Sequence, residues 1–309
     1  MGWTAADIGD LSGLAAVVTG ANSGIGMIAA GELARRGAAT VLACRDVAKG
    51  EAAAQLMKKA APHASIEVRQ LDLADLASVR AFAAAYTGGL DVLVNNAGVM
   101  ALPYRQTVDG FEMQFGTNHL GHFALTGLLL PRLLERPDPR VVTVSSGLHK
   151  GGHIDFDDLQ GERSYRKWAA YGQSKLANLL FAYELQRRAA GALTSVAAHP
   201  GYAATNLQAV GPRMEGNPIL EFGSRLGNVL FAQSAERGAL PLLYAATERG
   251  LAGGTYVGPD GRFGSRGYPT PVDSSPASKD RAVAARLWSV SEALTGVHYD
   301  FPADTAPAK

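Results

Sequence analysis

Strand-like and helix-like segments alternate along this chain from its start, and this alternation limits the fold more than any other feature. Strands are expected at the short apolar runs 14–19, 39–44, 65–71, 91–98, 140–146 and 193–201. Helical spacing of apolar residues predicts helices at 24–37, 46–60, 74–86, 110–134, 169–189 and near 279–295. Parallel strands need crossover connections, and the crossing helices cover both faces of the sheet. The alternation therefore predicts an α/β fold, a doubly wound parallel β-sheet flanked by helices on both faces.

The chain is expected to form a single domain over residues 1–309. No proline- or glycine-rich linker is long enough to separate two domains, and a glycine- and proline-rich stretch at 253–276 comes late and holds one expected strand. With 47% hydrophobic residues the chain can build a buried core. We expect that core at about 12–258, followed by a C-terminal extension at about 259–309.

A glycine-rich turn, TGANSGIG at residues 19–26, directly follows the first expected strand and opens the first helix. Gly20, Gly24 and Gly26 would let the backbone turn tightly and approach a pyrophosphate, and the helix N-terminus supplies amide donors. The spacing differs from the general G-x-G-x-x-G fingerprint, and glycines at such a turn can also be purely structural. In the context of the alternating segments, the turn predicts a Rossmann-type dinucleotide-binding domain.

The end of the second expected strand carries the signal for cofactor choice. An acidic residue there would bind the ribose 2′-hydroxyl, but the sequence reads ACRD, with Cys44 in that place and Arg45 next to it. A guanidinium can make charge-assisted, bidentate bonds to a 2′-phosphate. We therefore expect NADP(H) to be preferred, with NAD(H) as the second option. Arg45 can also be a solvated loop charge, and Asp46 could bind the ribose instead.

The segment YGQSK places the phenol of Tyr171 and the ammonium of Lys175 four positions apart, on one face of an expected helix. Alone this pair is weak evidence. A chain with 10 tyrosines and roughly 8 lysines contains a Tyr-x-x-x-Lys by chance about one time in four. Its interpretation depends on the motifs that surround it.

Seven short motifs occur in a fixed order: TGANSGIG (19–26), DL (72–73), NNAG (95–98), TNHLG (117–121), VSS (144–146), YGQSK (171–175) and HPG (199–201). This ordered set resembles the short-chain dehydrogenase/reductase family over roughly residues 12–296. Within that family, ACRD, TNHLGHF, YGQSKLANLLFAYEL and LWSVSEALTG (287–296) resemble the retinol dehydrogenase-like branch, which includes many bacterial oxidoreductases. Light-dependent protochlorophyllide reductases share some of these motifs but usually have a different sequence in place of NNAG at the fourth strand.

The resemblance implies a role for individual residues. Tyr171 would be the catalytic acid/base, Lys175 its partner, Ser146 the group that polarises the substrate oxygen, and Asn118 the organiser of a proton-relay water. Ser146 is preferred over its neighbour Ser145 because it matches the second serine of the family motif. Cofactor binding would fall to Gly20, Asn22, Ser23, Gly24, Ile25, Gly26, Arg45, Asp72, Leu73, Asn95, Ala97, Gly98, Tyr171, Lys175, Pro200, Gly201 and Thr205.

The implied chemistry explains why a tyrosine and a lysine would be paired. Hydride transfer to a carbonyl carbon leaves a developing alkoxide that must receive a proton. The ordinary pKa of tyrosine, near 10, is too high for an efficient proton shuttle at neutral pH. A lysine at i+4, together with an oxidised nicotinamide, would favour the phenolate and lower that pKa.

These features predict an NADP(H)-dependent oxidoreductase that interconverts a carbonyl and an alcohol on a hydrophobic substrate such as a retinoid, steroid or polyketide. Two alternatives remain open, a protochlorophyllide reductase-like C=C reductase and a non-catalytic NADP(H)-binding regulatory protein. Two segments would wall the substrate cleft. One is the long insertion 147–168, which places 25 positions between Ser146 and Tyr171, and the other is a substrate lid at about 202–230.

Composition argues against several other functions. The formal net charge of +1 gives no indication of a basic surface that would bind nucleic acid. The single cysteine, Cys44, suits a reducing compartment. The longest apolar stretch, 120–134, is interrupted and too short to span a bilayer, and no signal peptide is evident. His119 and His122 lack an acid or cysteine that would complete a metal site. We expect a cytoplasmic protein that forms a homodimer or homotetramer, by resemblance through the helices carrying Asn118 and Tyr171.

Overall fold

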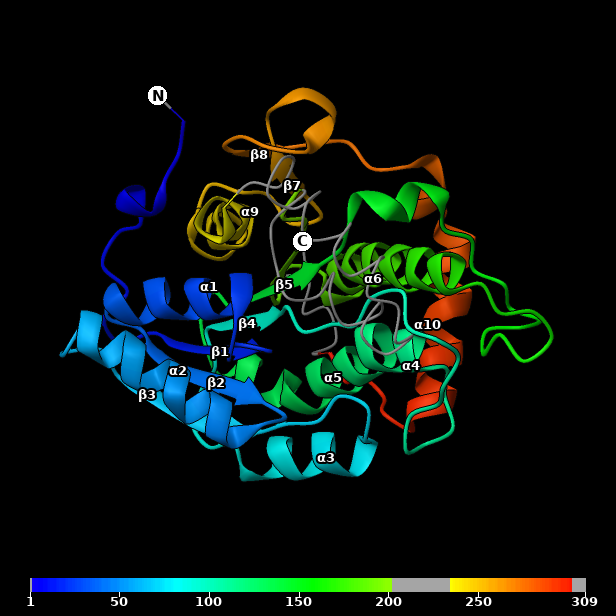
Figure 1. Ribbon diagram of the computed structural model, residues 1–309, viewed down its shortest axis with the longest axis horizontal. Coiled ribbons are helices and arrows are strands. Elements are labelled where there is room, and N and C mark those ends of the chain that lie inside the picture. The colour runs from blue at the N-terminus through cyan, green and yellow to red at the C-terminus, as the bar shows by residue number, and fades with distance from the viewer. Residues whose placement is uncertain (1, 202–233, 302–309) are drawn as a thin grey trace, which may run out of the picture.

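An eight-stranded sheet crosses the middle of the protein in the computed structural model, which describes residues 2–201 and 234–301 (Figure 1). Its strand order is β3-β2-β1-β4-β5-β6-β7-β8. The strands are β1 (Ala15–Thr19), β2 (Ala39–Cys44), β3 (Ile66–Gln70), β4 (Val92–Asn95), β5 (Arg140–Val144), β6 (Thr194–Ala198), β7 (Tyr256–Pro259) and β8 (Pro269–Pro271). All neighbours pair in parallel except β7 and β8, which are antiparallel.

Helices cover both faces of this sheet. The α-helices are α1 (Gly24–Arg35), α2 (Val47–Ala60), α3 (Leu76–Ala85), α4 (Met113–Phe115), α5 (Gly121–Leu134), α6 (Lys167–Ala189), α9 (Ala235–Thr247) and α10 (Arg281–Thr295). Shorter helical turns are η1 (Ala5–Asp7), η2 (Gly116–Leu120), η3 (Gly147–Gly151), η4 (Arg262–Gly264) and η5 (Pro276–Lys279). Figure 1 shows α1 and α9 on one side of the sheet and α3 and α5 on the other. Buried contacts place α2 in the layer of α1 and α9, and α6 in the layer of α3 and α5.

The two helical layers pack on alternate residues of the strands. In β1, Ala16 and Val18 belong to a buried cluster with α1, α2 and α9, whereas Val17 belongs to the cluster with α3, α5 and α6. Successive side chains of a strand point to opposite faces, so a strand buried on both sides reads as a continuous apolar run. The predicted doubly wound Rossmann-type fold is confirmed.

Several segments differ from the sequence-based expectation. The stretch 253–276 was expected to hold one strand, but it forms two, β7 and β8. β8 is an edge strand that contains Pro269 and Pro271, which lack a backbone donor, and proline is tolerated at an edge. The helix expected over 110–134 starts at Met113 and contains a π-helical turn, η2. The helix α9 was not predicted.

The C-terminal helix α10 lies across α6 and α5 (Figure 1). Its Trp288 stacks on Phe181 of α6 with ring centres 5.8 Å apart, and the Tyr299 hydroxyl beyond it donates to the Phe123 carbonyl of α5 at 2.6 Å. Every residue of α6 from 171 to 182 is buried. The middle of α6 is therefore enclosed within a single copy of the chain. None of the described helices is long and apolar enough to span a membrane.

Candidate active site

A large cavity of about 1570 Å³ opens at the carboxyl ends of the strands. It lies where the strand order reverses, because β1 has β2 on one side and β4 on the other. Open α/β sheets bind ligands at such a switch point. The volume exceeds the roughly 300–1,000 Å³ typical of a pocket for one small ligand, so a cofactor and a substrate can fit side by side.

The glycine turn forms one end of the cavity and has the geometry expected of a phosphate cradle. Gly20 and Gly24 adopt φ of +66° and +58°, in the left-handed region that favours glycine. A Cβ on Gly26 would collide with the side chain of Asn96 and lie 2.8 Å from the Gly20 carbonyl oxygen. The Ser23 side chain makes no capping hydrogen bond at the start of α1, which leaves the first amides of that helix for an anion.

The Thr19 hydroxyl, just before this turn, joins three segments of the site. Its oxygen accepts hydrogen bonds from the backbone N–H groups of Asn96 and Ala97, both at 2.9 Å. His122 Nε2 lies 2.9 Å from this oxygen, and His122 Nδ1 lies 3.0 Å from the Asn118 carbonyl oxygen. Burial lowers the pKa of His122 to about 4, so the ring is neutral. Because a carbonyl can only accept, Nδ1 carries the proton, and the Thr19 hydroxyl donates to Nε2.

At the other end of the cavity, α6 presents Tyr171 and Lys175 four residues apart, and both line the cavity. The Lys175 ammonium lies 5.7 Å from the centre of the Tyr171 ring and donates to the Val144 carbonyl at 3.2 Å. Burial raises the pKa of Tyr171 to about 12, opposed by a hydrogen bond with Ser146, and burial lowers the pKa of Lys175 to about 8. Desolvation thus raises the tyrosine pKa, whereas the lowering expected from Lys175 was tied to an oxidised nicotinamide beside it.

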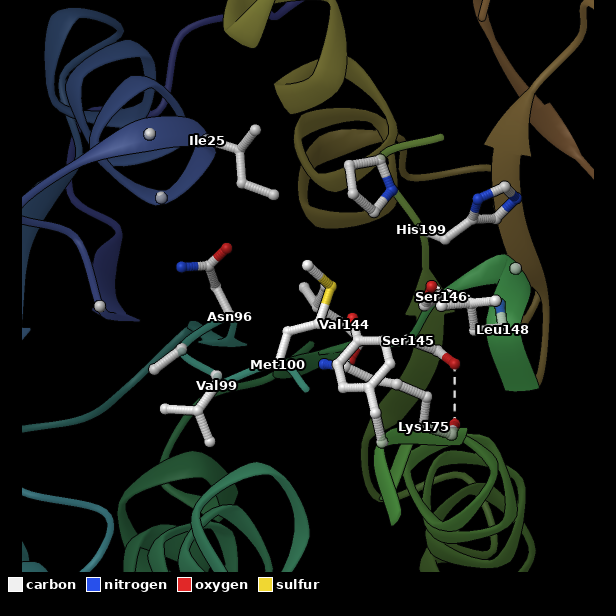
Figure 2. A pocket seen from close by; sticks show the side chains of 18 of the residues that line it. Ile25, Asn96, Val99, Met100, Val144, Ser145, Ser146, Leu148, Lys175 and His199 are labelled. Atoms are coloured by element: carbon white, nitrogen blue, oxygen red, sulfur yellow. Dashed lines mark hydrogen bonds between the residues drawn. The ribbon is translucent and has the colours of Figure 1, made fainter. Parts of the chain in front are cut away.

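The two serines at the end of β5 have different environments. Ser145 donates to the Lys175 carbonyl at 2.8 Å and so holds β5 against α6 (Figure 2). The Ser146 hydroxyl accepts from Leu148 N at 3.2 Å and is the hydroxyl that interacts with Tyr171. His149 donates from Nδ1 to the Ser146 carbonyl at 2.6 Å, which fixes the turn. The choice of Ser146 over Ser145 stays a prediction, and the contact of Ser146 with Tyr171 supports it.

Residues 14–215 match the family model for short chain dehydrogenases. The chain belongs to the short-chain dehydrogenase family. It is 45% identical to retinol dehydrogenase 13 of Homo sapiens over 297 residues, covering 93% of this chain and 86% of that protein.

Solved structures support the same assignment. An uncharacterized protein of Mycobacterium paratuberculosis is 50% identical, with a TM-score of 0.80, over 97% of this chain and 100% of that chain. A protein described as an NAD(P)-dependent gluconate 5-dehydrogenase of Beutenbergia cavernae, with bound NADP, is 28% identical, with a TM-score of 0.59, over 77% of this chain and 91% of that chain. Membership of this family makes the protein an oxidoreductase.

One predicted cofactor residue, Asn95, lies away from the cavity. Asn95 is fully buried, donates from Nδ2 to the Thr126 hydroxyl at 2.9 Å and does not line the cavity. Its neighbour Asn96 lines the cavity and donates to the Thr19 carbonyl at 2.7 Å. Strand alternation explains the difference, because Leu93 and Asn95 both face α5 while Val94 faces the other layer.

Asn118 also lies behind the cavity wall. Its Oδ1 accepts from Val99 N at 2.8 Å, and its Nδ2 donates to the Val99 carbonyl and the Ser174 hydroxyl, both at 2.9 Å. The side chain therefore ties the segment after β4 to α6, and it is fully buried in the π-helical turn η2. Such turns are rare and occur frequently at functional sites.

The part of the cavity next to the start of α2 contains a cation, Lys49, that was not predicted from the sequence. Arg45, Asp46 and Lys49 line the cavity, as do Asp72 and Leu73. The Asp46 carboxylate accepts from Lys49 N at 3.0 Å as the N-cap of α2 and pairs with the Lys49 ammonium at 2.9 Å. These bonds commit Asp46 to the helix and argue against a ribose role. The position of Lys49, one turn into α2, is a signal that the sequence offered.

The remaining predicted residues divide between the cavity and the undescribed part of the chain. Thr205 and the expected lid at 202–230 lie outside the described residues. Only the two ends of the insertion line the cavity, at 147–150 and 167–168.

Among the described residues, no group of three or more His, Cys, Asp or Glu side chains could hold a metal ion. The remaining predicted cofactor residues all line the cavity: Gly20, Asn22, Ser23, Gly24, Ile25, Gly26, Ala97, Gly98, Pro200 and Gly201.

Proposed function

We propose that this short-chain dehydrogenase is an NADP(H)-dependent enzyme that interconverts a hydrophobic carbonyl compound and its alcohol. The observation that carries the proposal is that Tyr171, Ser146 and Lys175 meet at one end of a cavity that begins at the glycine turn. Support comes from the identity to a retinol dehydrogenase and from the related chain with bound NADP. A lining that includes Val99, Met100 and Val144 suits an apolar substrate.

The residues present fit a dinucleotide phosphate. The bare backbone of the glycine turn and the first amides of α1 would bind the pyrophosphate, and Arg45 with Lys49 would bind the 2′-phosphate. When bound, the reduced nicotinamide supplies the hydride. The preference for NADP(H) over NAD(H) is part of the proposal. Arg45→Ala should raise the NADPH KM more than the NADH KM, and an unchanged ratio of the two would refute this assignment.

Three side chains would handle the substrate oxygen. The Ser146 hydroxyl would donate a hydrogen bond to the carbonyl oxygen as negative charge develops on it. The Tyr171 hydroxyl would transfer its proton to that oxygen, which completes the alcohol and leaves a phenolate. The Lys175 ammonium would stabilise the phenolate from the next turn of the same helix. In the oxidation direction Tyr171 would take the proton back.

A pair of tyrosine variants tests this assignment. Tyr171→Phe removes the proton donor and should lower the rate of NADPH consumption with a panel of aldehydes, ketones, quinones and retinoids by about 10²–10⁴-fold. Tyr183→Phe is the matched control, because Tyr183 is on the same helix but bonds Ser274 at 2.9 Å and does not line the cavity. Full activity in Tyr171→Phe would overturn the mechanism.

The same panel separates the alternatives. Tight NADPH binding without turnover of any member would favour a regulatory protein. Saturation of a conjugated C=C bond, with the carbonyl left intact, would favour a C=C reductase.

Assembly and location stay predictions. A homodimer or homotetramer through α5 and α6 meets an obstacle, because α10 lies across these helices and residues 171–182 are all buried. We therefore propose that any homo-oligomer of this chain forms through another face. Cross-linking between copies at positions of α6 would contradict that proposal. A cytoplasmic location is expected from the sequence alone.

A further inference from the structure

Two large apolar side chains are exposed together at the reacting end of the cavity. Trp168 is 54% exposed and Leu148 is 48% exposed, and both line the cavity. A tryptophan is usually well buried, and exposed apolar groups gathered at one place often mark a binding surface. The other large exposed hydrophobic residues in the described part of the chain do not line the cavity: Val47, Leu56, Tyr104 and Val108.

Each of the two side chains flanks a group proposed to bind the substrate oxygen. Trp168 sits in the first turn of α6, three residues before Tyr171, and its ring centre lies 6.5 Å from that of Tyr171 with an interplanar angle of 85°. Leu148 lies two residues after Ser146, and its backbone N–H donates to the Ser146 hydroxyl. Figure 2 shows Leu148 next to Ser146. A substrate that reaches Tyr171 and Ser146 therefore passes these two side chains.

Further apolar side chains line this end of the cavity, beside the polar His149, Lys150 and Lys167. Val99 and Met100 line it from the segment after β4, and Val144 lines it from the end of β5 (Figure 2). An indole face offers a flat surface of negative potential, which prefers offset or edge-on aromatic partners. A saturated chain on the same surface would gain only the hydrophobic stabilisation that comes from burying apolar area.

We propose that Trp168, with Leu148, forms a subsite for a flat, conjugated or aromatic group attached to the substrate carbonyl, so that Trp168 determines specificity for aryl and conjugated carbonyl compounds. The occupant is the substrate because the two side chains are continuous with Tyr171 and Ser146. This inference rests on the proposed function, since it names the substrate class of the same site.

The first test compares two aldehydes of similar shape, benzaldehyde and cyclohexanecarbaldehyde. The ratio of their kcat/KM values should favour the aryl compound and should fall about 2- to 13-fold in Trp168→Ala, which corresponds to the 0.5–1.5 kcal/mol of an aromatic pair. Trp168→Phe should retain most of the ratio. Trp3→Phe is the control, because Trp3 packs on Tyr244 and does not line the cavity. An unchanged ratio in an active Trp168→Ala would overturn the subsite while leaving the proposed function intact.

A binding measurement covers the case of no turnover. In the presence of NADP⁺, naphthaldehyde should quench tryptophan emission in the wild type and in Tyr171→Phe, and much less in Trp168→Phe. Equal quenching in Trp168→Phe and the wild type, or no quenching in either, would overturn the subsite. Loss of turnover on every carbonyl, with quenching retained, would refute the proposed function alone.

Discussion

Replacing Thr19 by valine would remove one hydroxyl and keep the shape of the side chain. In the structure that hydroxyl accepts from Asn96 N and Ala97 N and contacts His122 Nε2, all at 2.9 Å. In Thr19→Val, the Ala97 amide loses its acceptor, the Asn96 amide keeps only the Val94 carbonyl at 3.0 Å, and the imidazole loses its donor. The variant therefore tests whether this hydroxyl holds the turn after β4 next to the glycine turn.

The expected cost follows from the groups left without partners. A buried polar group without its hydrogen bond costs about 1–3 kcal/mol, so the Ala97 amide and the His122 imidazole set an upper limit near 6 kcal/mol. Asn96 and Ala97 are only half-buried, so water can replace part of the loss. We expect a loss of about 2–4 kcal/mol in the free energy of unfolding, together with a higher KM for NADPH, because Gly20 is adjacent to Thr19 and packs on Ala97.

Urea unfolding at equilibrium is the assay, with the m-value checked for constancy. Thr19→Ser is the matched control. It keeps the hydroxyl and removes only a buried methyl group, at about 0.5–1.5 kcal/mol. If the valine variant unfolds at the same urea midpoint as the serine variant, and binds NADPH as well, the reasoning about this hydroxyl is wrong.

Three further predictions concern the core and the reacting groups. Trp288→Ala should lower the free energy of unfolding by about 3–5 kcal/mol, measured with urea, because a buried indole is lost from its stack on Phe181. Gly98→Ala should lower kcat roughly 10-fold with little change in the urea midpoint, since the new Cβ would lie 3.0 Å from Asn118 Oδ1 and 3.5 Å from Lys175 Nζ. Lys175→Met should change how stability depends on pH. Between about pH 8 and 10.5 the unfolded chain binds a proton at Lys175 that the folded chain lacks, so the wild type gains stability as pH rises. Unfolding midpoints measured across that window should rise less steeply in the variant, and equal slopes would contradict the lowered pKa.

Local chemistry made much of the fold and the conformation of the glycine turn predictable from the sequence. Runs such as 14–19 and 140–146 are apolar because their strands are covered on both faces, and the structure has strands there. Gly20 and Gly24 were found because a tight strand-to-helix turn requires positive φ, and both residues have it. In each case the requirement acts over a few consecutive residues, where sequence spacing reports it directly.

The misses have a different cause. Asn95 and Asn96 are adjacent, and the one that faces the cavity depends on which side of β4 packs on α5, a fact fixed by the whole sheet. Trp168 was missed because the expected helix began at 169, whereas α6 begins at Lys167 and its i+3 spacing places Trp168 next to Tyr171. Side-chain direction at a strand end is a tertiary property and the first residue of a helix is poorly marked in sequence, so local patterns do not determine either.

The pairing of Tyr171 and Lys175 combines these two levels. The i+4 spacing puts both side chains on one helix face, but the packing that encloses α6 also removes them from water. Burial raises the pKa of the phenol and lowers that of the ammonium, so it favours the neutral form of each group. The hydrogen bond with Ser146 opposes this only at the tyrosine. At neutral pH a pKa of about 8 leaves Lys175 mostly charged, whereas the Tyr171 phenolate must gain stabilisation from whatever occupies the cavity. It follows that the pH dependence of kcat, which reports the complex, should differ from that of kcat/KM, which reports the free enzyme.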